Sequence, residues 1–124
     1  LRKLAGEARA RAHKGVDIAA PKGTGVQVAA EGRVLRTGYD AGGFGNFIEV
    51  SHPNGMTSLY GHLSRIDVAS GMTVESGQRI GLVGSTGYST GPHLHFQIER
   101  NGRTVDPARV VGRAFAVVVK ASQA

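Results

Sequence analysis

Residues 91–105, GPHLHFQIERNGRTV, contain the clearest strand and turn signals in this chain. Polar and apolar side chains alternate from His93 to Arg100, which is the period-2 pattern of a strand with one buried face. The dipeptide Asn101-Gly102 follows, and its tolerance of positive φ predicts a tight turn and a short return strand over residues 103–105. His93 and His95 are two residues apart, so the strand places both imidazoles on one face.

Short apolar runs of the same kind, separated by glycine-containing turns, continue from Val16 onward. With 19 glycines in 124 residues and only 6% aromatic residues, the composition favours a loop-rich β protein over a helical bundle. We therefore expect a mostly β domain, an antiparallel sandwich or partly open barrel. The expected strands are VQVAA (26–30), RVLRTGY (33–39), NFIEVSH (46–52), MTSLYGHL (56–63), RIGLVGS (79–85) and HLHFQIER (93–100).

A second hairpin signal is His52-Pro53-Asn54-Gly55, where Asn54 and Gly55 are expected to supply the positive φ angles of a tight turn. The chain divides into three expected parts. Residues 1–12 are helix-compatible but lack a good cap, so they are interpreted as a leader or linker end. Residues 13–110 form the domain, and residues 111–124, apolar and β-branched, form a C-terminal tail.

The composition excludes several classes of function. There is no cysteine, so any zinc must be held by histidine and carboxylate. The net charge is +6, yet the arginines are scattered and no basic stripe is interleaved with aromatic residues, so no nucleic-acid partner is expected. No run approaches the roughly 20 apolar residues of a membrane span, and no signal peptide is visible.

His13 and Asp17 are the first candidate metal ligands. They are four residues apart with a glycine between them, which favours a loop that leads into a strand over a helix. One nitrogen from His93 or His95 would complete a set of two histidines and one aspartate, with a fourth position open for catalysis. Taken singly, His13 and Asp17 are better explained as a solvated loop histidine and a turn carboxylate.

His62 ends another strand-like run and could lie across the same site, although a satisfied, partly buried histidine is the simpler alternative. His52, beside the turn, is interpreted as structural. The chain has no HExxH helix, GxSxG elbow, Walker loop or cysteine nucleophile. The remaining histidines could therefore handle protons and stabilise an oxyanion, whereas surface exposure or ion pairing accounts for Glu49 and Glu99.

Three segments closely resemble the lysostaphin-type, or LytM-like, zinc metallopeptidases of bacterial cell walls. They are HKGVDIAAPKGTGVQVAAEGRV (13–34), GNFIEVSHPNGMTSLYGHLSRI (45–66) and GQRIGLVGSTGYSTGPHLHFQIERNGRTVDP (77–107). The resemblance implies that zinc is bound by His13, Asp17 and His95, and that His62 and His93 act beside the metal as catalytic histidines. Every matching ligand position is intact, which favours a working enzyme.

The resemblance further implies zinc-dependent endopeptidase cleavage of peptidoglycan cross-links or stem peptides by a zinc-activated water. It implies a fold like the duplicated hybrid motif, with a groove walled by loops around Phe44, Tyr88 and residues 64–76. It also implies a cell-envelope location, periplasmic or extracellular. One departure is Gly25, where the family often has proline. Peptidoglycan peptides are the expected partner, anionic envelope polymers a further one, and a monomer is expected.

Two other functions compete with this one. A non-catalytic module could bind peptidoglycan or activate another hydrolase without cleaving it. Alternatively, VESGQRIGLVG (74–84) is similar to the strand-turn-strand of biotinyl and lipoyl carrier domains, which need a lysine at an exposed hairpin tip. No lysine occupies such a hairpin, since the four in the chain are Lys3, Lys14, Lys22 and Lys120.

Overall fold

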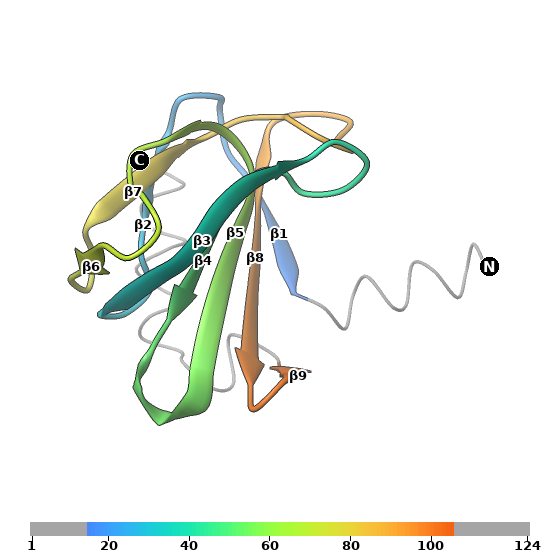
Figure 1. The fold of residues 1–124 in the computed structure, drawn as a ribbon. Helices are drawn as coiled ribbons and strands as arrows, with labels where there is room; N and C mark the ends of the chain where they lie inside the picture. The colour runs from blue at the N-terminus through green and yellow to red at the C-terminus, as the bar shows by residue number, and fades with distance from the viewer. Residues whose placement is uncertain (1–14, 106–124) are drawn as a thin grey trace.

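The computed structural model describes residues 15–105, which form one antiparallel sheet of nine strands (Figure 1). Every strand pairing in this part of the chain is antiparallel, and the expectation of a mostly β fold is confirmed. The elements are β1 (Val16–Ala19), β2 (Gly25–Gln27), β3 (Gly32–Asp40), β4 (Gly45–Ser51), the 3-10 helix η2 (Pro53–Gly55), β5 (Met56–Ile66), β6 (Thr73–Val74), β7 (Arg79–Val83), β8 (His93–Arg100) and β9 (Arg103–Val105).

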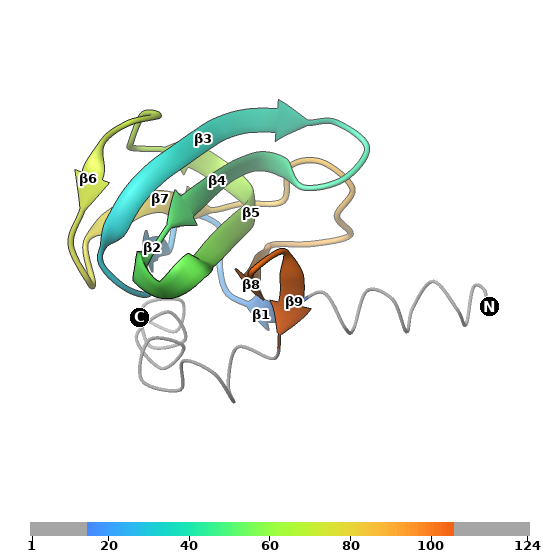
Figure 2. The same ribbon diagram turned by 60° about the horizontal axis from the view of Figure 1, so that its bottom comes forward.

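The long strand β5 organises the sheet. The strand order is β1-β8-β5-β4-β3-β6, β9 pairs with β8, and β7 pairs with both β2 and β5. β5 therefore contacts β8 along its first half, β4 along most of its length and β7 near its end. The strands curve, so that β2 and β7 lie under the arch of β3 (Figure 2). The sheet is an open one that folds over its own core.

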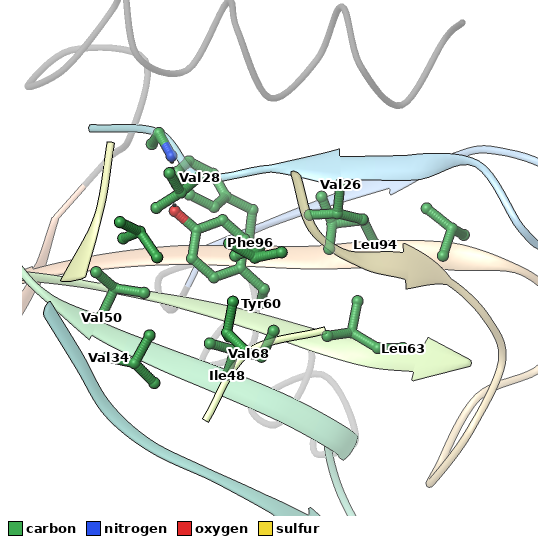
Figure 3. Close-up of a cluster of buried hydrophobic side chains, with 14 of the residues drawn as sticks. Val26, Val28, Val34, Ile48, Val50, Tyr60, Leu63, Val68, Leu94 and Phe96 are labelled. Atoms are coloured by element: carbon green, nitrogen blue, oxygen red, sulfur yellow. Dashed lines mark hydrogen bonds between the residues drawn. The ribbon is translucent and has the colours of Figure 1, made fainter. Parts of the chain in front are cut away.

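The core lies between the strands β2 and β7 and the strands that arch over them. Tyr60 of β5 and Phe96 of β8 are fully buried, with ring centroids 5.4 Å apart. Figure 3 shows Val26 and Val28 on one side of these two rings and Ile48 on the other. Burying side chains of this size contributes about 1.5–3 kcal/mol each. Strand β8 thus places Phe96 in the core and leaves its alternate residues for the opposite face.

Of the two turns predicted from Asn-Gly dipeptides, one forms as expected and the other takes a different conformation. At the end of β8, Asn101 and Gly102 take φ angles of 52° and 83°, and the predicted turn and return strand are confirmed. Between β4 and β5 the chain forms η2 instead of a tight two-residue turn. Gly55 has a φ of 73°, as expected for the glycine of this turn. The preceding proline, which starts the 3-10 turn, accounts for the difference.

Several strand boundaries also differ from the sequence expectation, among them the ends of β5 and β7. The run VQVAA does not continue as a strand to residue 30, because the pairing of β2 with β7 shifts register between Val26 and Gln27 and β2 ends at Gln27. The expected leader (1–12) and tail (111–124) lie outside the described residues. In residues 15–105 no helix has the length and hydrophobicity to cross a membrane.

Candidate functional site

The site forms where β1 pairs with β8. The register places Asp17 opposite His95 and Ala19 opposite His93. Asp17 Oδ1 lies 2.8 Å from His95 Nδ1 and 3.7 Å from His93 Nε2. A carboxylate from one strand and two imidazoles from its neighbour therefore converge at one point, and the prediction that His93 and His95 share a face is confirmed.

His95 is buried at the centre of this cluster. Its ring stacks on Phe44, with centroids 5.3 Å apart. Its second nitrogen, Nε2, lies 2.9 Å from Oε1 of Gln97, which is two residues further along β8. His95 is thus held on three sides, by an aromatic face, by a carboxylate and by an amide.

His62 reaches the same point from β5. Its φ of 64° is in the left-handed region, which few non-glycine residues adopt, and its N–H donates to the carbonyl of Phe44 at 2.6 Å. The Nδ1 of His62 lies 2.8 Å from the carbonyl oxygen of Thr86. The unusual backbone turns the ring toward its neighbours, with centroids 4.5 Å from His93 and 6.2 Å from His95. Strained backbone of this kind is concentrated at functional sites.

His93 is oriented by the polar loop that precedes β8. Its Nδ1 lies 2.8 Å from the carbonyl oxygen of Gly91 and 3.4 Å from Ser89 Oγ. Because a carbonyl oxygen only accepts hydrogen bonds, Nδ1 carries the proton in the neutral ring. The same reasoning applies to His62 beside Thr86. In both histidines Nε2 is therefore the nitrogen with a free lone pair.

Burial affects the protonation of His62. Desolvation lowers the pKa of His62 below its ordinary value of 6.5, and the neighbouring His93 and His95 lower it further. The hydrogen bond to Thr86 and the charge of Asp17 oppose this shift. The lower pKa keeps His62 neutral at neutral pH, so its Nε2 can accept a proton.

The loop that holds His62 is packed closely against the start of β4. A Cβ at Gly45, where φ is 61°, would collide with the backbone of Thr86, and a Cβ at Gly87 would collide with the backbone of Gly45. Thr86 Oγ1 also donates to the carbonyl of Leu63 at 2.7 Å. These glycines allow two loops to touch, and that contact fixes the carbonyl that orients His62.

The structure brings four of the five expected site residues together: Asp17, His62, His93 and His95. The fifth, His13, lies outside the described residues, and within residues 15–105 no group of three histidine, aspartate or glutamate side chains is arranged to hold a metal ion. The sequence reading missed Gln97 and Thr86. The signal for Gln97 was its period-2 spacing from His95. The contact of Thr86 with His62 is made across 24 residues, and nothing local indicates it.

The whole site lies within a stretch that matches a known family. The model of peptidase family M23 matches residues 11–107. The chain belongs to peptidase family M23. Among solved structures of this family type, the catalytic domain of lysostaphin from Staphylococcus simulans has a TM-score of 0.74 and 39% identity, over 81% of this chain and 79% of that one. The resemblance to lysostaphin-type peptidases is confirmed.

Two further proteins that are similar to this chain have names that state an activity. A zinc-containing peptidase from Vibrio cholerae has a TM-score of 0.72 and 38% identity, over 75% of this chain and 28% of that one. The peptidoglycan DD-endopeptidase ShyA of Vibrio cholerae is 43% identical over 98 residues. That alignment covers 79% of this chain but 23% of ShyA, so this chain spans less than a quarter of its relative.

Proposed function

We propose that this M23 domain is a zinc-dependent endopeptidase that hydrolyses peptide bonds in peptidoglycan cross-links or stem peptides. The observation that carries the proposal is the convergence of the Asp17 carboxylate with the imidazoles of His62, His93 and His95. The names of the relatives, one a zinc-containing peptidase and one a peptidoglycan endopeptidase, support the metal and the substrate class.

The oxygen atoms around the His95 ring suit the binding of a cation beside Asp17. Both ring nitrogens of His95 face oxygen atoms, Nδ1 facing Asp17 Oδ1 and Nε2 facing Gln97 Oε1. A neutral imidazole has one N–H, so it satisfies only one of two acceptors. Imidazole with carboxylate is a donor set that zinc takes, and a zinc ion held by Nδ1 and Asp17 would leave the single ring proton on Nε2 for Gln97. We propose that Asp17 and His95 bind zinc together with His13.

When bound, zinc would lower the pKa of a water molecule to about 7 and polarise the scissile carbonyl. His62 and His93 lie beside this point, and the neutral form of either ring would have Nε2 free to accept the proton of the attacking water. The ring that has accepted it becomes an N–H donor, able to stabilise the developing oxyanion or to protonate the leaving amine. We propose that the two histidines share these tasks.

The proposed substrate places the domain in the cell envelope, periplasmic or extracellular, where peptidoglycan is found. The expected groove around Phe44, Tyr88 and residues 64–76 stays a prediction. Phe44, stacked on His95, and Tyr88, which is exposed, are suitably placed for contacts with a peptide.

Digestion of defined cross-linked muropeptides by the full chain, followed by mass spectrometry, tests this function. We expect cleavage at a peptide bond, loss of cleavage after chelation, and recovery on addition of one equivalent of zinc. A chain that binds zinc and peptidoglycan without cleaving any muropeptide would instead be a non-catalytic module. A chain that cleaves equally well without metal would contradict the zinc mechanism.

A further inference from the structure

We propose that Gln97 is a positioning residue that fixes the tautomer of His95 and thereby sets the affinity of the site for zinc. This inference rests on the proposed function, because it concerns how His95 is prepared to bind the metal. Gln97 would not contact the metal or the substrate. It would act through the single proton of the His95 imidazole.

The geometry of β8 brings the two side chains together. His95 and Gln97 are alternate residues of one strand and are 5% and 7% exposed. Gln97 Oε1 lies 2.9 Å from His95 Nε2, a good hydrogen-bond distance. The amide oxygen accepts a hydrogen bond, so Gln97 favours the neutral tautomer that carries its proton on Nε2 and directs the Nδ1 lone pair toward Asp17.

Without Gln97 the other tautomer is favoured. Asp17 Oδ1 lies 2.8 Å from Nδ1, so a proton on Nδ1 would make a strong hydrogen bond to the carboxylate. That proton would occupy the nitrogen and the oxygen that we assign to zinc, and the metal would have to displace it. Gln97 and Asp17 therefore compete for one proton, and Gln97 keeps the metal-binding tautomer populated.

The chain holds Gln97 in place with the segment that precedes Asp17. Gly15 has a φ of 142°, and a Cβ there would lie 2.6 Å from the Cβ of Gln97 and 2.5 Å from the carbonyl oxygen of Phe96. The backbone at Gly15 is thus in direct contact with Gln97. Such close packing leaves no room for a side chain at position 15 beside Gln97.

His95 has the side chains of Asp17 and Gln97 as the partners of its two ring nitrogens. His62 and His93 are oriented by the backbone carbonyls of Thr86 and Gly91. A side-chain partner can be removed by mutation without changing the backbone. Side chains that accept from the outer nitrogen of a zinc-binding histidine typically contribute a factor of 10–100 to metal affinity.

The first test is the zinc dissociation constant of the full chain, measured by competition with a chromogenic chelator. Gln97→Met keeps a similar length but lacks the amide, and we expect it to bind zinc about 10–100-fold more weakly. Gln97→Glu can only accept from Nε2–H, so we expect zinc affinity at least equal to that of the wild type. Glu99→Gln, two residues further on the same face of β8, is the matched control and should leave the affinity unchanged.

The second test uses the metal-free chain with 15N-labelled histidine. Long-range proton–nitrogen spectra should show the proton of His95 on Nε2 in the wild type and in Gln97→Glu, and on Nδ1 in Gln97→Met. Unchanged signals from His52, at a distance from the site, would show that each variant is folded.

The outcomes separate this inference from the proposed function. Failure of the wild type to bind zinc would overturn the proposed function. Zinc binding by the wild type with equal affinity in Gln97→Met would overturn the role of Gln97 alone, as would an unchanged His95 tautomer in that variant. If Gln97→Met does not fold, weaker zinc binding by Gln97→Glu or a proton on its Nδ1 would overturn the role of Gln97.

Discussion

His52 and the three site histidines are used differently, although His52 is half-buried like His93. His52 Nδ1 lies 2.7 Å from the carbonyl oxygen of Glu31, and its Nε2 lies 2.7 Å from Ser58 Oγ. Ser58 Oγ is 2.8 Å from the hydroxyl of Tyr60, which accepts from the N–H of Ala29 at 2.9 Å. Both nitrogens of His52 are therefore committed to the scaffold.

Each site histidine has one nitrogen held by an acceptor of the scaffold, while the other nitrogen is directed into the site. For His62 and His93 the held nitrogen is Nδ1, and for His95 it is Nε2. The comparison teaches that burial alone does not mark a functional histidine. What distinguishes the site is a second nitrogen that faces a shared point beside Asp17.

The largest expected effect comes from removing a site histidine. His62→Ala removes a proton acceptor and oxyanion donor but no proposed zinc ligand, so we expect kcat for muropeptide cleavage to fall by about 10²–10⁴-fold. Zinc content and thermal unfolding should stay close to those of the wild type. Unchanged turnover would place His62 with His52 among the scaffold residues.

His52→Ala should have the opposite effect, on stability instead of turnover. The substitution removes the hydrogen bonds to the carbonyl of Glu31 and to the hydroxyl of Ser58, and we expect a loss of about 1–3 kcal/mol in the free energy of unfolding. Denaturant titration measures this loss. Cleavage per folded molecule should be unchanged, and a large fall in kcat at full folding would contradict the division between the two regions.

The same network predicts a dependence of stability on pH. Burial lowers the pKa of His52 below its ordinary value of 6.5, in opposition to the hydrogen bond to Glu31. Just below pH 6.5 the unfolded chain therefore binds more protons than the folded one, and stability falls as the pH falls. Above pH 6.5 the contribution is complete.

Chemical denaturation between pH 5 and 8 measures this contribution. His52→Asn should reduce the decline in stability at acid pH without abolishing it, because the pKa of His62 is lowered in the same direction. An equally steep decline in His52→Asn would show that His52 does not titrate with unfolding.

The smallest effect is expected at the surface, away from both histidine regions. Arg36 Nε is 2.7 Å from Glu49 Oε1, which confirms the interpretation of Glu49 as a surface ion-pair residue. The arginine is 64% exposed, so Arg36→Ala should cost less than about 1 kcal/mol, and less still in high salt. Thermal unfolding at two salt concentrations checks this. If Arg36→Ala lost as much unfolding free energy as His52→Ala, the hydrogen bonds of His52 would be no more important for stability than an exposed ion pair.

Strands whose signals are local were predictable. The bounds of β8 and β9 match the sequence expectation because Gly91-Pro92 and Asn101-Gly102 mark their ends and side-chain alternation marks the face. Strand β6 has only two residues, Thr73 and Val74, and such a run carries no periodicity. β2 ends early, at Gln27, where its pairing with β7 shifts register, and no local pattern indicates such a shift.

The site was predictable in its residues but not in its supports. Histidine spacing placed His93 and His95 on one face, whereas the separate roles for them came from family resemblance. The carbonyl of Thr86 and the amide of Gln97, which set the ring tautomers, depend on tertiary contacts and on atom-level geometry. Sequence patterns specify which side chains share a face but not which nitrogen bears the proton.

The zinc content of purified single-alanine variants of the full chain tests the assignment of the site most directly. The wild type, His52→Ala, His62→Ala and His93→Ala should each hold about one equivalent of zinc. His13→Ala, Asp17→Ala and His95→Ala should each lose most of it while remaining folded. Full zinc content in His95→Ala, or loss of zinc in His52→Ala, would contradict the division between metal-binding, proton-handling and structural histidines.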